Sequence, residues 1–361
     1  MIPFRVLIFG SGSLVKSTCY ALSASRTSSL EISLAARSTS QVSEIVAAAN
    51  IRSRLMDAAV RFAGFAASWE ENAIEHLLAR VRPDLVLHAA SLDSPWRRND
   101  GSLWADLISR GGFGISLPLQ AALVTKVARV MAQRAPGCPL VNASYPDAVN
   151  PVLNALGLNV LCGVGNVGIL AAVCEEQATT GETFSILAHH SDVSRIATSN
   201  TPTTARVRLW SGDTEIEPAD TAFDAVRQIR GGELNQVTGA TIAKLLQQLA
   251  RGESFRSHVP GPNGLPGGYP VQFSGMAVSL DLPAALTHNE AIAHNQESAK
   301  VEGVFVEDGI VNFVGPAAET LREFVPDCPT VFPVSGIDRI AEIFGGIKNS
   351  VLTPANVTTH R

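Results

Sequence analysis

The feature that most constrains this chain is an apolar run at residues 4–9 that stops on the turn Gly10-Ser11-Gly12. Apolar residues then recur at helical spacing, and a second apolar stretch covers residues 30–36. This pattern predicts a strand, a helix and a parallel strand, the βαβ unit of dinucleotide-binding folds. Gly12 would let the backbone approach a pyrophosphate at the helix N-terminus. The residues expected to cradle the phosphates are Gly10, Ser11, Gly12, Ser13, Leu14 and Val15, the last of which replaces the usual third glycine.

The end of the second predicted strand indicates which dinucleotide binds. An NAD enzyme usually carries Asp or Glu there to hold the ribose 2′-hydroxyl, whereas this chain has Arg37, Ser38 and Thr39. A guanidinium can pair with a 2′-phosphate, and the hydroxyls can donate to it. We therefore expect NADP in preference to NAD. The alternative is that Arg37 is a solvated surface residue and that the pocket is empty or holds adenosine loosely.

Two more predicted strand ends are expected beside the cofactor. The apolar run at residues 84–88 is followed by small residues that leave room near the backbone, namely Ala89, Ala90 and Ser91. Residues 139–146 resemble another strand that runs into a polar turn, where Asn142 and Ser144 are expected to contact the cofactor.

The polar segment at residues 92–112 lies between these two strands in the sequence. It carries Arg97 and Arg98, which we assign to substrate binding on a mobile lid. The alternative for this segment is a plain surface loop.

Composition excludes several classes of protein. The chain has 361 residues, 46% of them hydrophobic and 17% charged, which is enough for two domains with a large core. A formal net charge of −5 and the lack of a Lys/Arg cluster argue against nucleic-acid binding. No leader and no apolar run as long as a membrane span is recognisable, so we expect a cytoplasmic protein without membrane contact. Five scattered cysteines without a CxxC argue against a disulfide framework or a structural zinc.

The chain divides by pattern into two parts. Residues 1–161 fit an NADP-binding, Rossmann-type α/β domain with a doubly wound parallel sheet. Residues 162–361 fit an α+β domain with antiparallel strands, expected to serve substrate binding and dimerisation. In this second part helices are predicted at residues 221–229, 239–251 and 337–345, and a tight hairpin at Glu307-Asp308-Gly309.

The order of parts in residues 84–165 resembles the lactate and malate dehydrogenase superfamily. It runs from a strand ending in small residues through an arginine-bearing loop, a helix, a strand and a helix to a short strand with Gly163-Val164-Gly165. Gly10-Ser11-Gly12 and Tyr20-Ala21-Leu22 fit the same family's opening, and the resemblance covers most of residues 4–195. It implies that residues 184–192 include the strand bearing the catalytic histidine, with His190 in that role and Asp192 beside it. It also implies a homodimer.

The sequence departs from that family where the substrate would bind. The family has an Asp that orients the histidine and an Arg that clamps a carboxylate, whereas residues 165–172 here are neutral and offer only Asn166 to a substrate. Asn-Pro beside the nicotinamide is replaced by Tyr145-Pro146, and Tyr145 could protonate a substrate or close the pocket. Since bidentate Arg contacts select a 2-oxo acid, we expect no ordinary lactate or malate turnover.

Three classes of function remain open from the sequence. The leading one is an NADP-dependent oxidoreductase that acts on a carbonyl or imine, in a small molecule or a modified peptide, with no metal ion. The second is a hydrolase resembling the NAD- and manganese-dependent glycosidases, with Cys162 and His190 as metal ligands, although the matching Cys-His pair is absent. The third is a non-catalytic NADP-binding protein, which would explain the loss of both charged residues.

Overall fold

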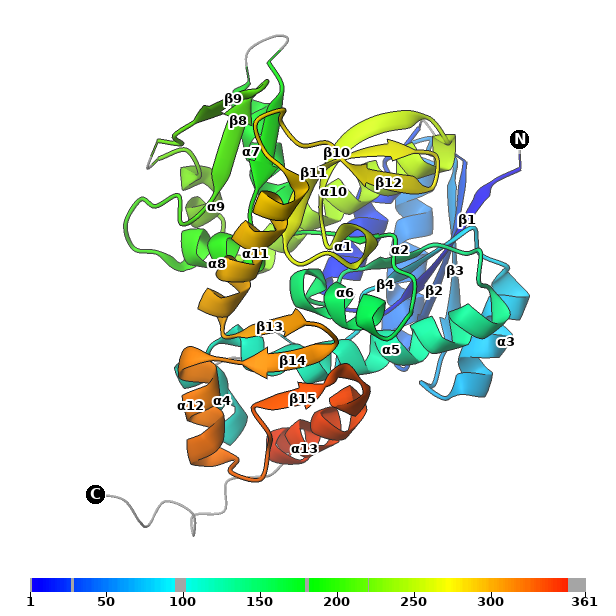
Figure 1. The fold of residues 1–361 in the computed structure, drawn as a ribbon. Coiled ribbons are helices and arrows are strands. Elements are labelled where there is room, and N and C mark those ends of the chain that lie inside the picture. Colours follow the sequence, from blue (N-terminus) through cyan, green and yellow to red (C-terminus); the bar gives the residue numbers. More distant parts are fainter. Residues whose placement is uncertain (1, 27–28, 95–101, 179–181, 220, 350–361) are drawn as a thin grey trace.

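The computed structural model describes residues 2–26, 29–94, 102–178, 182–219 and 221–349. Figure 1 shows a central sheet flanked by helices, with smaller sheets formed by the second half of the chain. The description below covers those residues.

Six parallel strands form the central sheet, in the order β3-β2-β1-β4-β5-β6. The chain moves outward from β1 to β3 and then crosses back to β4 on the other side of β1. This doubly wound order confirms the predicted Rossmann-type fold, and it places the switch in strand order between β1 and β4, where such sheets bind ligands at their carboxyl edge. The strands are β1 (Phe4–Phe9), β2 (Leu30–Ala36), β3 (Val60–Ala66), β4 (Leu85–His88), β5 (Leu140–Asn142) and β6 (Cys162–Gly163).

Helices connect these strands and cover the sheet. The helical segments of this first part are α1 (Ser13–Leu22), α2 (Thr39–Leu55), α3 (Glu71–Val81), α4 (Leu103–Gly111), the 3₁₀ turn η1 (Phe113–Ser116), α5 (Leu117–Arg134), α6 (Pro146–Ala155) and α7 (Val167–Gln177). The segment from Phe113 to Arg134 is long and apolar enough to cross a membrane, but most of it is buried inside the protein. It is therefore placed as a core helix against the sheet.

The second part contains three antiparallel sheets, as predicted. Their strands are β7 (Phe184–Leu187), β8 (Arg208–Ser211) and β9 (Thr214–Ile216); β10 (Ser254–Pro260), β11 (Gly268–Ser274) and β12 (Ala277–Leu280); and β13 (Val304–Glu307), β14 (Ile310–Phe313) and β15 (Val331–Pro333). The other helical segments are α8 (His190–Thr198), α9 (Asp224–Gln228), α10 (Gly231–Arg251), η2 (Pro262–Gly264), α11 (His288–Glu302), α12 (Gly315–Phe324), η3 (Val334–Gly336) and α13 (Ile337–Asn349). The predicted hairpin joins β13 to β14, with Asp308 and Gly309 at positive φ.

Helix α10 attaches this second part to the parallel-sheet unit. It packs against α1, and a Cβ atom on Gly239 would lie only 2.7 Å from the backbone of Ser17 and Thr18. Glycine at this position thus lets the two helices approach closely. A further contact, between α5 and α13, belongs to a hydrophobic cluster that joins the sheet to the last hairpin.

Two predicted boundaries of secondary structure are wrong. The predicted loop at residues 92–112 includes helix α4, and α10 begins eight residues before the predicted start at 239. In both cases tertiary packing overrides a polar or glycine-containing local pattern. Strand β6 pairs with β5, so the parallel sheet extends to Gly163.

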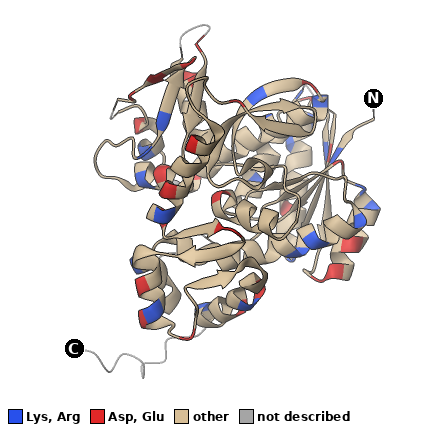
Figure 2. Ribbon diagram, in the orientation of Figure 1, with Lys and Arg blue, Asp and Glu red and all other residues tan. Residues whose placement is uncertain are grey.

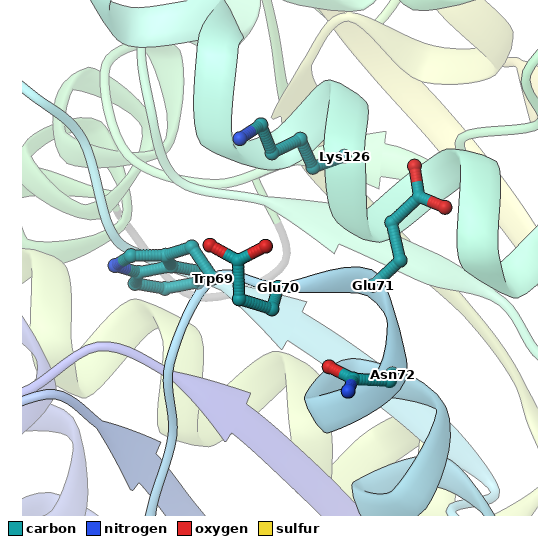
Figure 3. A pocket seen from close by; sticks show the side chains of 5 residues that line it. All are labelled: Trp69, Glu70, Glu71, Asn72 and Lys126. Carbon is teal, nitrogen blue, oxygen red and sulfur yellow. The ribbon is translucent and has the colours of Figure 1, made fainter.

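Neither the distribution of charged residues nor the surface hollow at the start of α3 coincides with the predicted site. Figure 2 shows acidic and basic residues interspersed along the outer helices, with few on the central strands. A hollow of about 410 Å³ lies where α3 begins beside α5 (Figure 3). Its lining residues are Trp69, Glu70, Glu71, Asn72 and Lys126, none of which was expected in the site.

Candidate functional site: a nucleotide cradle and a buried histidine–glutamate cluster

The residues of the predicted phosphate cradle lie at the turn between β1 and α1. Gly10 has φ +132°, and a Cβ atom there would lie 2.7 Å from the carbonyl oxygen of Ala89 at the end of β4. Gly12 caps α1 with an ordinary φ of −73°, and a Cβ atom there would meet nothing within 4 Å. Ser13 in the first turn of α1 accepts a hydrogen bond from Asn235 of α10, with the two atoms 2.7 Å apart. Gly10 is thus required by the fold, whereas Gly12 faces open space.

The end of β2 forms a polar corner beside this cradle. The Ser38 hydroxyl caps α2 by accepting the Gln41 backbone N–H at 3.3 Å, and Arg37 and Thr39 are exposed. The Gln41 amide oxygen accepts a hydrogen bond of 3.0 Å from the Ser11 hydroxyl, which ties this corner to the glycine turn. Gln41 was not predicted. No acidic side chain occupies residues 37–41, so the corner can accept an anionic group.

The other predicted cofactor contacts are largely engaged with protein. Asn142 is buried and donates to Asn150 at 2.9 Å, and its own amide oxygen accepts the Ser144 backbone N–H. The Ser144 hydroxyl donates to Gln120, also at 2.9 Å. Side chains half-buried at the end of β4 are those of Ala89, Ala90 and Ser91. Leu14 is half-buried, whereas Val15 is buried with a methyl group 3.3 Å from the Cβ position of Gly10, which fills the place that a third glycine would leave.

The histidine segment folds differently from the prediction. Strand β7 ends at Leu187, so His189 and His190 do not alternate along a strand. His189 caps α8, and its Nδ1 accepts the Ser191 backbone N–H at 3.1 Å. Asp192 does not contact the His190 ring in any described bond. Its carboxylate accepts the backbone N–H groups of His189 at 2.8 Å and Arg206 at 3.2 Å, which makes it a capping residue.

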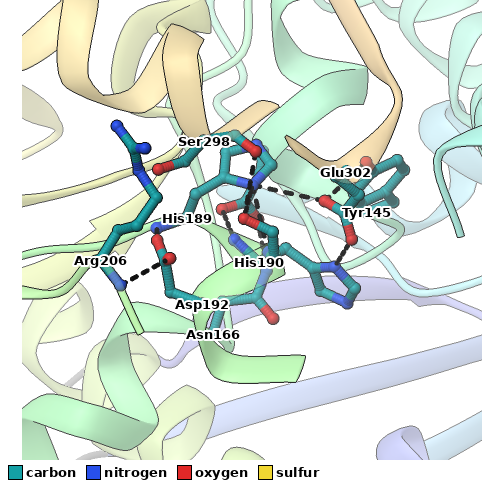
Figure 4. A network of polar contacts seen from close by, with 10 residues as sticks. Tyr145, Asn166, His189, His190, Asp192, Arg206, Ser298 and Glu302 are labelled. Atoms are coloured by element: carbon teal, nitrogen blue, oxygen red, sulfur yellow. Dashed lines mark hydrogen bonds and ion pairs between the residues drawn. The ribbon is translucent and has the colours of Figure 1, made fainter. Parts of the chain in front are cut away.

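The partner of His190 is Glu302, the last residue of α11. One carboxylate oxygen of Glu302 contacts His190 Nδ1, and the other accepts a hydrogen bond of 2.8 Å from the Tyr145 hydroxyl (Figure 4). A second carboxylate, Asp147 of α6, accepts the His190 backbone N–H at 2.9 Å and the Asn166 side-chain amide. Since a carboxylate can only accept, His190 carries a proton on Nδ1, and Nε2 is the nitrogen that gains or loses one.

The electrostatics of the two carboxylates differ. Burial acts to raise the pKa of Glu302, but the charges of His190 and His189 and the hydrogen bonds from His190 and Tyr145 hold it below its ordinary value. Burial raises the pKa of Asp147, which the two histidines oppose only in part. Burial and the Glu302 charge raise the pKa of Tyr145 far above its ordinary value. The phenol therefore remains a hydrogen-bond donor, and Glu302 remains a carboxylate that stabilises a protonated imidazole.

Two strained residues and an aromatic ring fix the geometry around this pair. Tyr145 and Asn166 have φ of 45° and 44°, uncommon values for side chains of their size, at the starts of α6 and α7. The ring of Phe113 lies over His190 at a centroid distance of 4.9 Å and against Tyr145 at 4.8 Å. Asp147 bonds both to Asn166 and to the His190 backbone, so one buried carboxylate holds the starts of three helices together.

The predicted substrate-binding residues are only partly described. Arg97 and Arg98 lie outside the described residues. Asn166 is half-buried, and its amide donates to Asp147, so it lies within the cluster rather than apart from it.

A groove of about 230 Å³ lies between α7, α10 and β10. The cations that line it are already paired: Lys244 with Glu175 at 2.8 Å, and Arg256 with Asp281. The lining residues from α7 and the turn before it are Gly165, Gly168, Ala171, Ala172 and Glu175. Within the described part of the chain, this groove therefore presents no unpaired lysine or arginine to a carboxylate.

The predicted alternative of a metal site has little support in the geometry. Cys162 is buried in β6 among apolar side chains, and burial raises the pKa of its thiol, which disfavours the thiolate that binds metals. Within the described residues, no group of three or more His, Cys, Asp or Glu side chains is arranged to hold a metal ion.

Comparison with known proteins supports the fold. No protein-family profile and no curated protein sequence matches the chain. Similar solved structures include the lactate dehydrogenase of Cryptosporidium parvum in complex with lactic acid and NAD, with 11% identity, a TM-score of 0.53, and coverage of 97% of this chain and 100% of that one. The lactate dehydrogenase of Eimeria maxima with NADH and oxamate is 13% identical, with a TM-score of 0.54 and coverage of 83% of this chain and 92% of that one. The malate dehydrogenase of Picrophilus torridus is 13% identical, with a TM-score of 0.55 and coverage of 97% of this chain and 100% of that one. This chain therefore has the fold of the lactate and malate dehydrogenases, as its sequence indicated.

Sequence reasoning missed the two carboxylates of the site. Asp147 lies in the turn into α6 shortly after β5, so its place near a strand end was a usable signal. Glu302 had no such signal, because it ends a helix more than a hundred residues from its partner. The buried polar residues Asn295, Ser298 and Glu302, which share one face of α11, were the only hint of it.

Proposed function

We propose that this protein is an oxidoreductase that uses a nicotinamide dinucleotide and acts on a carbonyl or imine substrate, with His190 as the proton donor and acceptor. The observation that carries this proposal is the contact between His190 and Glu302. His190 packs against Tyr145, at the carboxyl end of β5 and two strands along the same sheet edge from the glycine turn. Neighbouring strands lie about 4.8 Å apart, so a ligand of dinucleotide length can reach from one to the other.

The residues present fit such a cofactor. Open space in front of Gly12 and the first amides of α1 would receive the pyrophosphate, and the corner formed by Arg37, Ser38 and Thr39 would receive a ribose 2′-phosphate. The two similar lactate dehydrogenase structures contain NAD or NADH, so the preference for NADP is proposed from this corner alone. A bound nicotinamide supplies or accepts the hydride.

The chain's own residues would control the proton. Glu302 holds the Nδ1–H and stabilises the imidazolium, so Nε2 can give a proton to a substrate oxygen or nitrogen and take it back in the reverse direction. Phe113 and Tyr145 cover the ring and limit its contact with water, and the His190 side chain remains 20% exposed. This exposure gives a substrate access to the histidine.

The substrate is proposed to be a small molecule or a modified peptide that is not an ordinary 2-oxo acid. The neutral α7 face cannot form the bidentate pair that a carboxylate selects. Pyruvate and oxaloacetate should therefore be turned over poorly. Turnover of either at the rate of an ordinary dehydrogenase would show that another cation, such as the exposed Arg195, supplies the clamp.

The test combines cofactor binding with one substitution. The protein should bind NADPH, and it should oxidise it in the presence of a suitable carbonyl or imine from a panel of small substrates. His190→Ala should leave the unfolding temperature and NADPH affinity nearly intact, because the ring lies outside the cradle, while turnover falls by roughly 10² to 10⁴. NADPH binding without turnover of any panel member, in wild type and variant alike, would favour a non-catalytic NADP-binding protein. A homodimer remains a prediction, which sedimentation velocity would check.

A further inference from the structure

The charges around His190 suggest which substrates this site accepts. Glu302 and Asp147 are both buried, with 8% and 1% of their surfaces exposed. Within the described residues, Glu302 forms ion pairs only with His189 and His190, and Asp147 forms none. The cluster thus combines two carboxylates with two imidazoles and no paired lysine or arginine.

Among the residues that the structure describes, nearby cations do not compensate these carboxylates. Arg206 contributes only its backbone N–H, and Figure 4 shows its guanidinium directed away from His190. Lys244 and Arg256 are already paired in the groove beside α7. Before it accepts a proton from a substrate His190 is neutral, so it then balances neither Glu302 nor Asp147, and buried charges act over several ångströms because the protein interior screens them weakly.

The carboxylates also influence each other. The charge of Glu302 contributes to the raised pKa of Asp147, which shows that the two lie within electrostatic reach. A cation bound in front of the histidine would favour the ionised form of Asp147, whereas an anion would oppose it. Over a few ångströms in a protein interior, Coulomb attraction is strong enough to select between ligands of the same shape and different charge.

From this charge distribution we propose that the substrate is a cationic nitrogen compound, an amine in its ammonium form or the corresponding iminium, and not a carboxylic acid. This inference rests on the proposed function, because it names the substrate class of the same site. In the direction of amine oxidation, His190 Nε2 takes one proton from the ammonium nitrogen, which leaves a neutral amine and an imidazolium held by Glu302. The nitrogen lone pair then forms the C=N bond as the neighbouring carbon gives its hydride to the dinucleotide, so that charge and electrons balance.

The test measures binding, so it does not depend on turnover. Three five-membered rings of similar size and different charge would be titrated into the full-length protein, with and without saturating NADP⁺, by calorimetry at pH 7. They are pyrrolidinium, cyclopentanol and cyclopentanecarboxylate. We expect pyrrolidinium to bind at least tenfold more tightly than either of the others. Asp147→Asn should reduce this preference, whereas Glu297→Gln should not, because Glu297 lies on the exposed face of α11 and pairs with Lys300.

The outcomes separate this inference from the proposed function. Equal or tighter binding of the alcohol or the carboxylate, or no binding of pyrrolidinium, would overturn the cationic substrate. A clear preference for pyrrolidinium in a protein that never transfers hydride would support the charge argument and contradict the oxidoreductase. Hydride transfer with 2-oxo acids preferred over amines would support the oxidoreductase and contradict the cationic substrate.

Discussion

The nucleotide cradle and the His190 cluster differ in how far apart their residues lie in the sequence. The cradle is made almost entirely by residues 10–41, in which a strand, a turn, a helix and a second strand follow one another directly. The cluster joins Tyr145, His190 and Glu302, and the contact of Glu302 with Tyr145 spans 157 residues. The cradle is thus a property of a local segment, whereas the cluster exists only after three helices have packed together.

This difference has consequences for what each region tolerates. Positions in the cradle are constrained by backbone geometry, as at Gly10, where only the absence of a Cβ atom lets Ala89 approach. Positions in the cluster are constrained by charge and hydrogen bonding, since every partner is a side chain from another element. A substitution in the first region should therefore act on stability or cofactor affinity, and one in the second should act on turnover.

The largest effect is expected from Glu302→Gln. The Gln amide can donate to His190 Nδ1, which would hold the ring in the wrong tautomer and remove the charge that stabilises the imidazolium. Turnover should fall by roughly 10² to 10⁴, and the pH–rate profile for reduction should lose activity at a lower pH than in the wild type. Steady-state kinetics over pH 5 to 9 would measure both, with Glu297→Gln as the control from the exposed face of the same helix. A variant that keeps wild-type turnover would remove Glu302 from the mechanism.

The same substitution should change the response of stability to acid. The pKa of Glu302 is below its ordinary value of 4.5 in the folded protein, so its carboxylate stabilises the fold above that pH. This contribution is lost as pH falls below about 4.5 through the folded pKa. Urea unfolding between pH 3 and 6 should therefore show a shallower acid dependence in Glu302→Gln than in the wild type.

Gly10 and Gly12 provide a matched pair within the cradle. Gly10→Ala should lower the free energy of unfolding by about 1–3 kcal/mol or more, because an alanine is strained at φ +132°. Its Cβ atom would also collide with the backbone of Ala89. Gly12→Ala should leave the unfolding free energy unchanged or slightly higher, because its φ suits alanine and its Cβ atom meets only open space. It should instead weaken NADPH binding. If Gly12→Ala binds NADPH as tightly as the wild type, the pyrophosphate does not lie there.

The sequence predicted the fold class well because its signals are local. An apolar strand, a Gly-x-Gly turn and a second strand ending without an acid can be recognised within forty residues. The order of the six strands then follows from connection rules that hold for nearly all such folds.

The cluster could not be predicted in the same way. His190 was identified through a resemblance, but its partner was sought two residues away in Asp192, which instead caps α8. Glu302 could not be found, since helical periodicity shows which face is buried and not what lies opposite it. A carboxylate at the third helical position commonly accepts the backbone N–H of the residue that caps the helix. Here the Asp192 carboxylate accepts the His189 N–H in this way and does not contact the His190 ring in any described bond.

A smaller effect is expected from Arg37→Asp, which tests the cofactor corner of the cradle. A partly exposed guanidinium–phosphate contact contributes roughly 1.5–3 kcal/mol, so NADP⁺ affinity should fall by about tenfold to a hundredfold while NAD⁺ affinity is kept or improved. The measurement is a pair of titrations with NADP⁺ and NAD⁺. Arg54→Asp, an exposed charge reversal at the end of α2, controls for net charge. Equal affinities of the unaltered protein for the two cofactors would contradict the NADP assignment.

The smallest effect on turnover is expected from His189→Ala, although His189 is the sequence neighbour of His190 and also lies close to Glu302. Its Nδ1 accepts the Ser191 N–H, so Nδ1 is already engaged as an acceptor and does not donate to Glu302, 3.3 Å away. The role that remains is that of a helix cap. Loss of a cap costs about 0.5–2 kcal/mol, which thermal or urea unfolding would detect.

His189→Asn supplies the matched control, because Asn caps helices as well as any residue and should recover part of the lost stability. Both variants should keep most of the wild-type turnover once they are folded. If His189→Ala and His189→Asn instead lose turnover together while their unfolding free energies stay near that of the wild type, then His189 shares the proton with His190 through Glu302. The cluster would in that case act through two histidines, and its catalytic part would reach further into the protein than the pair of His190 and Glu302.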